Sequence, residues 1–127
     1  MKTVTAAIIS DGKGTILIAQ RAPGDKNAGL WEFPGGKLES GESPEAGLAR
    51  ELMEEFGVGS TIGGFFGESI YHYDHGSIRL IAYRATVAAP PRPLVHAALA
   101  WVTPAQMGGY EFSPADIPFV QQLQAEG

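Results

Sequence analysis

The sequence predicts an α+β domain in which a mixed β-sheet is sandwiched between helices, an α/β/α arrangement. Three observations predict it: β-rich segments before position 20 and from 61 to 88, a well-marked helix over residues 44–56, and a second helical pattern from Ser113-Pro114 to Gln124. Packing one helix against each face of a sheet buries both of its apolar sides. The length of 127 residues suits a single domain over residues 1–127.

The first two strands are expected to pair as a hairpin. Residues Val4 to Ser10 and Ile16 to Ala19 are strand-like, and Asp11-Gly12-Lys13-Gly14 between them is typical of a turn. A short extended piece, Trp31-Glu32-Phe33, follows a polar loop and ends at Pro34-Gly35-Gly36.

The helix over residues 44–56 has clear boundaries and two different faces. Ser43 is a good N-cap, Pro44 suits the first helical position, and Gly57 is a good terminator. At 100° per residue, the apolar face comprises Leu48, Ala49, Leu52, Met53 and Phe56. Gly47 lies on the opposite, acidic face. Since a glycine inside a helix costs about 1 kcal/mol relative to alanine, we expect a bulky group to approach it there.

The second half of the chain predicts a long hairpin, a further strand and a short helix. Residues 61–73 and 77–88 are strand-like and are joined by the turn Asp74-His75-Gly76. Residues 98–102 form the further strand, and Thr103-Pro104 starts the short helix. The histidines lack metal-ligand spacing, so we expect turn or surface positions for His72, His75 and His96.

Composition excludes several classes of protein. With no cysteine, the chain has no disulfide, thiolate zinc site or cysteine nucleophile. It has no apolar run of about 18 residues and no signal-peptide pattern, so we expect no membrane partner and a cytoplasmic location. The net charge of −5 disfavours a nucleic acid as partner, because proteins that bind the phosphate backbone are usually basic.

Most of the negative charge is concentrated between residues 36 and 58. This segment contains six glutamates and two basic residues, Lys37 and Arg50. Three of them, Glu51, Glu54 and Glu55, have helical spacings at which they repel one another. Hard divalent cations relieve such repulsion and bridge to phosphates, so we expect Mg²⁺ as the cofactor, with Mn²⁺ as the alternative ion. A solvated acidic helix face is the plain alternative.

The segment GKLESGESPEAGLARELMEEFGV, residues 36–58, resembles the Nudix box. That pattern is a glycine, five residues, a glutamate, seven residues, and then Arg-Glu-U-x-Glu-Glu-x-Gly-U, where U is a bulky aliphatic residue. All nine fixed positions are filled, by Gly36, Glu42, Arg50, Glu51, Leu52, Glu54, Glu55, Gly57 and Val58. The resemblance implies the Nudix fold and a metal-dependent hydrolase.

The flanking stretches AQRAPGDKNAGLWEFPGGKLE and YEFSPADIPFVQQL resemble the MutT-type branch and its relatives that hydrolyse cytidine triphosphates. This resemblance implies a nucleoside triphosphate substrate, cleaved to the monophosphate and pyrophosphate. Known preferences in the branch include oxidised guanine nucleotides and CTP with its modified forms. The alternatives are a Nudix hydrolase of ADP-ribose or dinucleoside polyphosphates and a catalytically silent nucleotide-binding module. We expect a monomer or a homodimer.

The resemblance also implies roles for individual residues. The metal is expected at Gly35, Gly36, Glu51, Glu54 and Glu55, where the glycine pair lets a backbone carbonyl approach the ion. Catalysis is expected to involve Arg50, Glu51 and Glu54. Many relatives place a glutamate in the loop before the last strand, but residues 93–101 contain no acid, and Val95 or His96 occupies its place. We therefore expect the general base on the helix, with Glu51 as first candidate and Glu54 as second.

On the substrate side, the matching positions are Arg21, Glu32, Phe33, Pro34, Gly35, Lys37 and Asp116. Asp116 matches the base-reading residue before the final helix, with a helix-start role as its plain alternative. An ionised aspartate only accepts hydrogen bonds and suits an amino group on the base, whereas a protonated one would also serve an oxidised purine. Four aromatic residues are candidates for base stacking or for core packing: Trp31, Tyr71, Tyr73 and Phe112.

Overall fold

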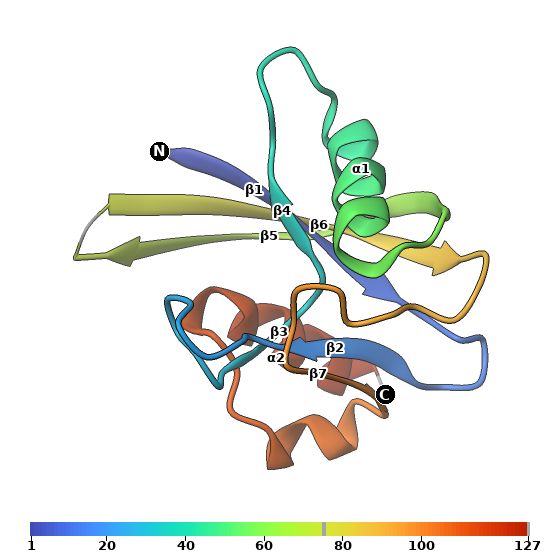
Figure 1. The fold of residues 1–127 in the computed structure, drawn as a ribbon. Coiled ribbons are helices and arrows are strands. Elements are labelled where there is room, and N and C mark those ends of the chain that lie inside the picture. Colours follow the sequence, from blue (N-terminus) through green and yellow to red (C-terminus); the bar gives the residue numbers. More distant parts are fainter. Residues whose placement is uncertain (75, 127) are drawn as a thin grey trace.

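The computed structural model describes residues 1–74 and 76–126 and contains two β-sheets and two α-helices (Figure 1). The first sheet has the strand order β4-β1-β6-β5, with the bounds β1 Lys2–Ile9, β4 Gly35–Lys37, β5 Ser60–Tyr73 and β6 Gly76–Val87. The second has the order β3-β2-β7, with the bounds β2 Ile16–Gln20, β3 Trp31–Glu32 and β7 Ala98–Val102. The helices are α1 Pro44–Phe56 and α2 Ile117–Glu126, and the short 3₁₀ segments are η1 Ala105–Gly109 and η2 Pro114–Asp116.

This architecture confirms the α+β prediction, but the strands form two sheets where one was expected. The four-stranded sheet is mixed, because β1 runs parallel to β6 and antiparallel to β4. The predicted hairpin of β5 and β6 is confirmed, and its two strands are antiparallel. The predicted C-terminal helix is divided into the 3₁₀ turn η2 and the helix α2. No helix in the described part of the chain is long and apolar enough to span a membrane.

The predicted hairpin of the first two strands is wrong. β1 pairs with β6 over eight positions and also with β4, so both of its edges are occupied. β2 belongs to the other sheet, and a single bridge between Ser10 and Ile16 links the two segments. The physical reason lies in burial: residues Ala6 to Ile9 are all buried, which is typical of a central strand covered on both faces.

β1 separates two hydrophobic cores. Ala7 and Ile9 face the core that contains Leu48, Leu52 and Phe56 of α1. The alternate residues Ala6 and Ile8 face the other core, to which α2 contributes Phe119, Val120 and Leu123. Figure 1 shows the corresponding arrangement, with α1 and α2 on opposite sides of the layer that contains β1 and β6. This packing fixes α1 beside the edge strand β4.

The ends of α1 are as the sequence predicts. The Ser43 side chain accepts a hydrogen bond from the Ala46 N–H at 3.2 Å, and Gly57 ends the helix with a φ of 67°. The apolar face is narrower than expected, because Met53 is 53% exposed. Packing against one side of the sheet covers only the stripe of Leu48, Leu52 and Phe56.

Candidate functional site

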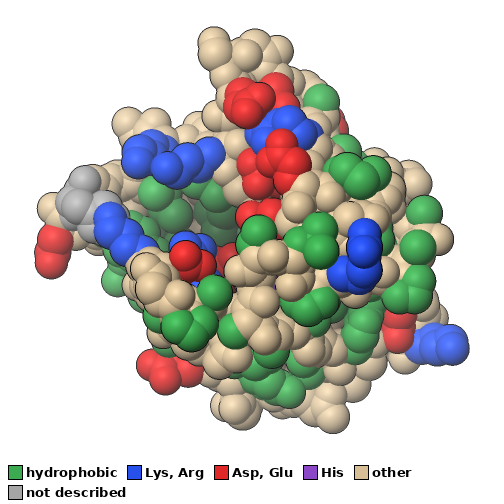
Figure 2. Space-filling model, viewed as in Figure 1, with side chains coloured by type: hydrophobic (Ala, Val, Ile, Leu, Met, Phe, Trp, Pro, Cys, Tyr) green, Lys and Arg blue, Asp and Glu red, His purple; other side chains and the backbone are tan. Residues whose placement is uncertain are grey.

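A cleft of about 440 Å³ lies between β4, the acidic side of α1 and the segment around Asp116. A volume of this size suits a small-molecule ligand. Figure 2 shows the surface hollowed next to a group of acidic side chains, with lysine or arginine side chains along its rim. Nine of the residues predicted from the sequence line it: Arg21, Glu32, Phe33, Gly35, Gly36, Lys37, Glu51, Glu55 and Asp116.

Three predicted residues do not line this cleft. The Pro34 side chain is fully buried, and its carbonyl accepts a hydrogen bond from the Ala7 N–H at 2.7 Å. Glu54 is 57% exposed on the outer side of the helix, and Arg50 lies among the glutamates. Pro34 therefore supports the wall of the cleft from behind, while Arg50 and Glu54 form the border of the acidic side.

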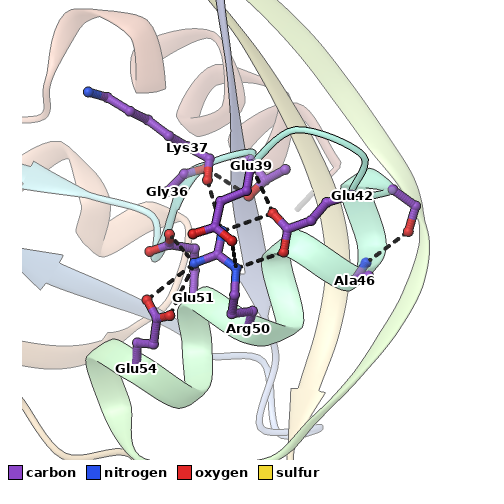
Figure 3. A network of polar contacts seen from close by, with 10 residues as sticks. Gly36, Lys37, Glu39, Glu42, Ala46, Arg50, Glu51 and Glu54 are labelled. Carbon is purple, nitrogen blue, oxygen red and sulfur yellow. Dashed lines mark hydrogen bonds and ion pairs between the residues drawn. The ribbon is translucent and has the colours of Figure 1, made fainter.

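Arg50 organises the acidic side (Figure 3). Its guanidinium donates to Glu42 at 2.7 and 2.9 Å, to Glu51 at 2.9 Å and to Glu54 at 3.2 Å. It also donates to the Lys37 carbonyl at 3.1 Å, which joins α1 to β4. The bonds from Arg50 lower the pKa of Glu42 to about 2. The positive charge of Arg50 thus offsets part of the repulsion among the glutamates that it contacts.

Two glycines permit the close packing of this region. A Cβ on Gly36 would collide with the Glu51 carboxylate, so only glycine lets that side chain lie against β4. A Cβ on Gly47 would collide with Leu38 and would stand 2.9 Å from Oε1 of Glu42. The bulky group expected at Gly47 is therefore the Leu38 and Glu42 pair, which belongs to the same chain.

The donor atoms fit a hard divalent cation. In the described residues, no three His, Asp or Glu side chains already converge on a metal position. However, Glu51 and Glu55 both line the cleft, and the Glu55 Oε1 atom is buried with no hydrogen-bond partner. The Gly36 carbonyl, which accepts a bond from the Thr5 hydroxyl at 3.1 Å, adds a backbone oxygen beside them. An unpartnered buried carboxylate oxygen among carboxylate and carbonyl oxygens suits Mg²⁺ or Mn²⁺.

Because Glu55 is buried, we expect the stability of the metal-free protein to depend on pH. Burial raises its pKa from 4.5 to about 7, because burial disfavours the charged carboxylate. Between these values the folded state holds a proton that the unfolded state releases. The free energy of unfolding therefore falls as the pH rises from about 4.5 to about 7, by up to about 3 kcal/mol from this group.

Urea titrations in EDTA at pH 5 and pH 8 measure this effect. The Glu55→Gln variant keeps the size of the side chain and removes the titrating group. We expect the variant to be more stable than the unmodified chain at pH 8 and similar to it at pH 5. An equal difference at both pH values would contradict the assignment.

Three predicted substrate residues, Arg21, Glu32 and Asp116, also line the cleft. Arg21 Nη1 lies 3.0 Å from Oε1 of Glu32, and Arg21 Nε donates to the Lys26 carbonyl at 2.6 Å. Asp116 Oδ1 accepts the Phe33 N–H at 3.2 Å. Burial raises the pKa of Asp116 well above its usual range, and the charge of Glu32 adds to this effect. Burial thus favours the protonated acid, which donates as well as accepts, more than it would be favoured in an exposed aspartate.

Among the aromatic candidates, Tyr73 lines the cleft, as does Phe33. Trp31 packs edge-on against Tyr110, and Phe112 is buried against Phe33, so both serve the core on the α2 side. Tyr71 is 36% exposed and contacts Tyr73 at 4.6 Å between ring centroids.

Sequence reasoning missed several lining residues. Lys26 and Asn27 come from the loop after β2, and Ser113 precedes η2. The Ser113 hydroxyl is buried without a hydrogen-bond partner and does not cap the helix. A serine before a proline predicts a helix start, so only the fold shows that Ser113 lines the cleft.

The prediction of turn or surface positions holds for the backbone of His96, which lies in the bend before β7, but its side chain is not at the surface. Its side chain is only 5% exposed, and its Nε2 lies 3.0 Å from Oε2 of Glu32. His72 is exposed as expected, with Nδ1 2.6 Å from the Ser77 hydroxyl, and His75 lies outside the described residues. An apolar ring face at Phe56 and an acceptor at Glu32 together make the interior favourable for His96. Neither neighbour is evident from the loop sequence.

Comparison with known proteins gives the same family. The NUDIX domain matches residues 1–123. The chain is 40% identical over 131 residues to the CTP pyrophosphohydrolase of Escherichia coli (strain K12), covering 98% of this chain and 93% of that protein. It is 40% identical over 113 residues to the putative 8-oxo-dGTP diphosphatase 2 of Mycobacterium tuberculosis (strain ATCC 25618 / H37Rv), covering 86% and 79% of the two proteins.

Solved structures have the same fold. The solution structure of the E. coli ORF135 protein matches with a TM-score of 0.87 at 38% identity, covering 98% of this chain and 89% of that one. The crystal structure of the MutT protein from Methanosarcina mazei Go1 also matches with a TM-score of 0.87, at 29% identity, covering 98% and 94%. With the complete acidic motif on β4, α1 and the residues that flank the helix, and with relatives that align along nearly the whole chain, this protein belongs to the Nudix family of hydrolases.

Proposed function

We propose that the chain is a Mg²⁺-dependent nucleoside triphosphate pyrophosphohydrolase that acts on CTP or on oxidised and modified nucleotides. The observation that carries this proposal is the lining of the cleft, which combines the carboxylates of Glu51 and Glu55 on α1 with Asp116 of η2. We expect the metal-bound polyphosphate at the two glutamates and the base at Asp116. The names of the two curated relatives, one for CTP and one for 8-oxo-dGTP, support the same substrate class.

The roles of the chain's own groups follow from this arrangement. Glu51 and Glu55, which line the cleft, would hold the cation with a backbone carbonyl of the Gly35-Gly36 pair, and Glu54 would join them from the border of the acidic side. Such a cation neutralises the polyphosphate and lowers the pKa of water. Glu51 accepts the proton of the attacking water, since it lines the cleft and Glu54 does not. Lys37 and Arg21 add positive charge where the phosphates bind.

The base-reading role of Asp116 is compatible with both substrate types. A protonated Asp116 presents an O–H donor and a carbonyl acceptor, so it can pair with a base that offers either group. Its Oδ1 atom is engaged by the Phe33 N–H, which fixes the plane of the carboxyl group. Discrimination between bases would then come from the second oxygen of Asp116.

A nucleotide panel tests the proposed function. The panel contains CTP, dCTP, 5-methyl-dCTP, 8-oxo-dGTP and 2-hydroxy-dATP, with ADP-ribose and a dinucleoside tetraphosphate as competitors. We expect pyrophosphate release from at least one triphosphate in Mg²⁺ and none in EDTA. Faster turnover of ADP-ribose or of the dinucleotide would favour those branches. Tight binding without turnover of any compound would indicate a silent binding module.

A further inference from the structure

Backbone hydrogen bonds on both sides of His96 fix the segment between β6 and β7 that carries it. The Leu94 N–H donates to the Glu55 carbonyl at 3.2 Å, and the Ala97 N–H donates to the Gln20 carbonyl at 2.9 Å. Val95 between these anchors is 50% exposed, whereas the His96 side chain is 5% exposed. His96 therefore points inward from a loop whose neighbouring side chains are apolar.

His96 also connects the catalytic helix to the substrate wall. Its ring stacks on Phe56, the last residue of α1, with 5.2 Å between the ring centroids and 11° between the planes. Its Nε2 lies 3.0 Å from Oε2 of Glu32. Because a carboxylate only accepts hydrogen bonds, Nε2 carries the hydrogen and donates it.

Glu32, which accepts the hydrogen bond from His96, also binds Arg21. Its other oxygen, Oε1, accepts a hydrogen bond from Nη1 of Arg21 at 3.0 Å. Arg21 in turn donates to the Lys26 carbonyl, and Arg21, Glu32 and Lys26 all line the cleft. Without His96, Glu32 would be held on one side only and could rotate about its side-chain bonds. The Arg21 guanidinium would then lose the fixed orientation of its carboxylate partner.

We propose that His96 is a positioning residue for nucleotide binding. It donates to Glu32, holds the Glu32–Arg21 pair at the cleft, and keeps that pair in a fixed position relative to the end of α1. This inference rests on the proposed function, because the ligand that would bind at Arg21 and Glu32 is the nucleotide. His96 itself does not line the cleft among the described residues, so it acts through Glu32.

Steady-state kinetics with the best nucleotide of the panel test the inference. His96→Phe keeps an aromatic ring for stacking on Phe56 and removes the donor, and His96→Leu removes both. We expect each variant to raise KM about 10-fold, the effect of one hydrogen bond to a charged group, with kcat within about 2-fold. His96→Gln, which can still donate to Glu32, should recover much of the lost affinity. His72→Phe, at an exposed position on β5, is the matched control and should leave KM unchanged.

A double-mutant cycle with Glu32→Gln separates positioning from a general loss of stability. If His96 acts through Glu32, its replacement should add little to the effect of Glu32→Gln on KM, and the two effects should not be additive. Additive effects, an unchanged KM in both donor-free variants, or no recovery in His96→Gln would overturn the inference.

The same cycle applied to nucleotide dissociation constants keeps the two proposals apart. If the unmodified chain binds nucleotides without hydrolysing them, the proposed function fails, and the cycle on Kd still decides the role of His96. If the chain neither binds nor hydrolyses any nucleotide of the panel, both proposals are overturned. Thermal melting of each variant identifies any that has lost its fold.

Discussion

Replacing Glu51 with glutamine is expected to lower kcat by roughly 10²- to 10⁴-fold, the contribution of a well-placed general base. Glu51 is the motif carboxylate that both lines the cleft and contacts Arg50, at 2.9 Å, and its side chain is 14% exposed. Glutamine has the same shape and still fits beside Gly36, but it cannot take a proton from water. Arg50 keeps its bonds to Glu42, so the helix should stay folded.

The measurement is kcat in saturating Mg²⁺, with circular dichroism as the check on folding. Glu45→Gln is the matched control, since Glu45 is an exposed glutamate of the first turn of the same helix. It should retain nearly full activity. If Glu51→Gln turns over at a rate close to that of the unmodified chain, Glu51 is not the base, and Glu54 becomes the next residue to replace.

The second large effect is expected at Asp116. Asp116→Ala should lower kcat/KM for the preferred base by roughly 5- to 150-fold, which corresponds to about 1–3 kcal/mol for leaving one hydrogen-bonding group of the base without its partner. It also leaves the buried Phe33 N–H without its acceptor, which should reduce the free energy of unfolding by about 1–3 kcal/mol. Metal affinity should not change, because Asp116 lies outside the acidic helix.

Asp116→Asn distinguishes base reading from a structural role. The amide keeps an oxygen for the Phe33 N–H and adds a permanent donor, so stability should be retained. We expect the ratio of kcat/KM for 8-oxo-dGTP to that for CTP to rise, because the amide donates whatever the pH. If both Asp116 variants lower kcat/KM equally for all nucleotides, or leave it unchanged for all of them, the residue supports the segment before α2 and reads no base.

The parts of the fold that depend on local chemistry could be predicted from the sequence. The limits of α1 follow from Ser43, Pro44 and Gly57, since caps act within one turn of the residues that form them. The clustering of the glutamates follows from their helical spacing, and the resemblance to the Nudix box gave the family. The hairpin of β5 and β6 follows from two adjacent strand-like segments joined by a short turn.

The features that depend on distant contacts could not be predicted in this way. A turn between β1 and β2 favours a hairpin locally, but β1 gains more from burial between β4 and β6. The orientation of His96 depends on Phe56 and Glu32, which are 40 and 64 positions away in the sequence. The raised pKa of Asp116 depends on burial that only the folded chain creates.

We expect water to cleave the triphosphate to a nucleoside monophosphate and pyrophosphate. The most direct measurement is chromatography of the products formed from CTP or 8-oxo-dGTP in Mg²⁺, without added pyrophosphatase and with an EDTA control. We expect equal amounts of the monophosphate and pyrophosphate, and no reaction in EDTA. Stoichiometric orthophosphate together with the nucleoside diphosphate would contradict the claim.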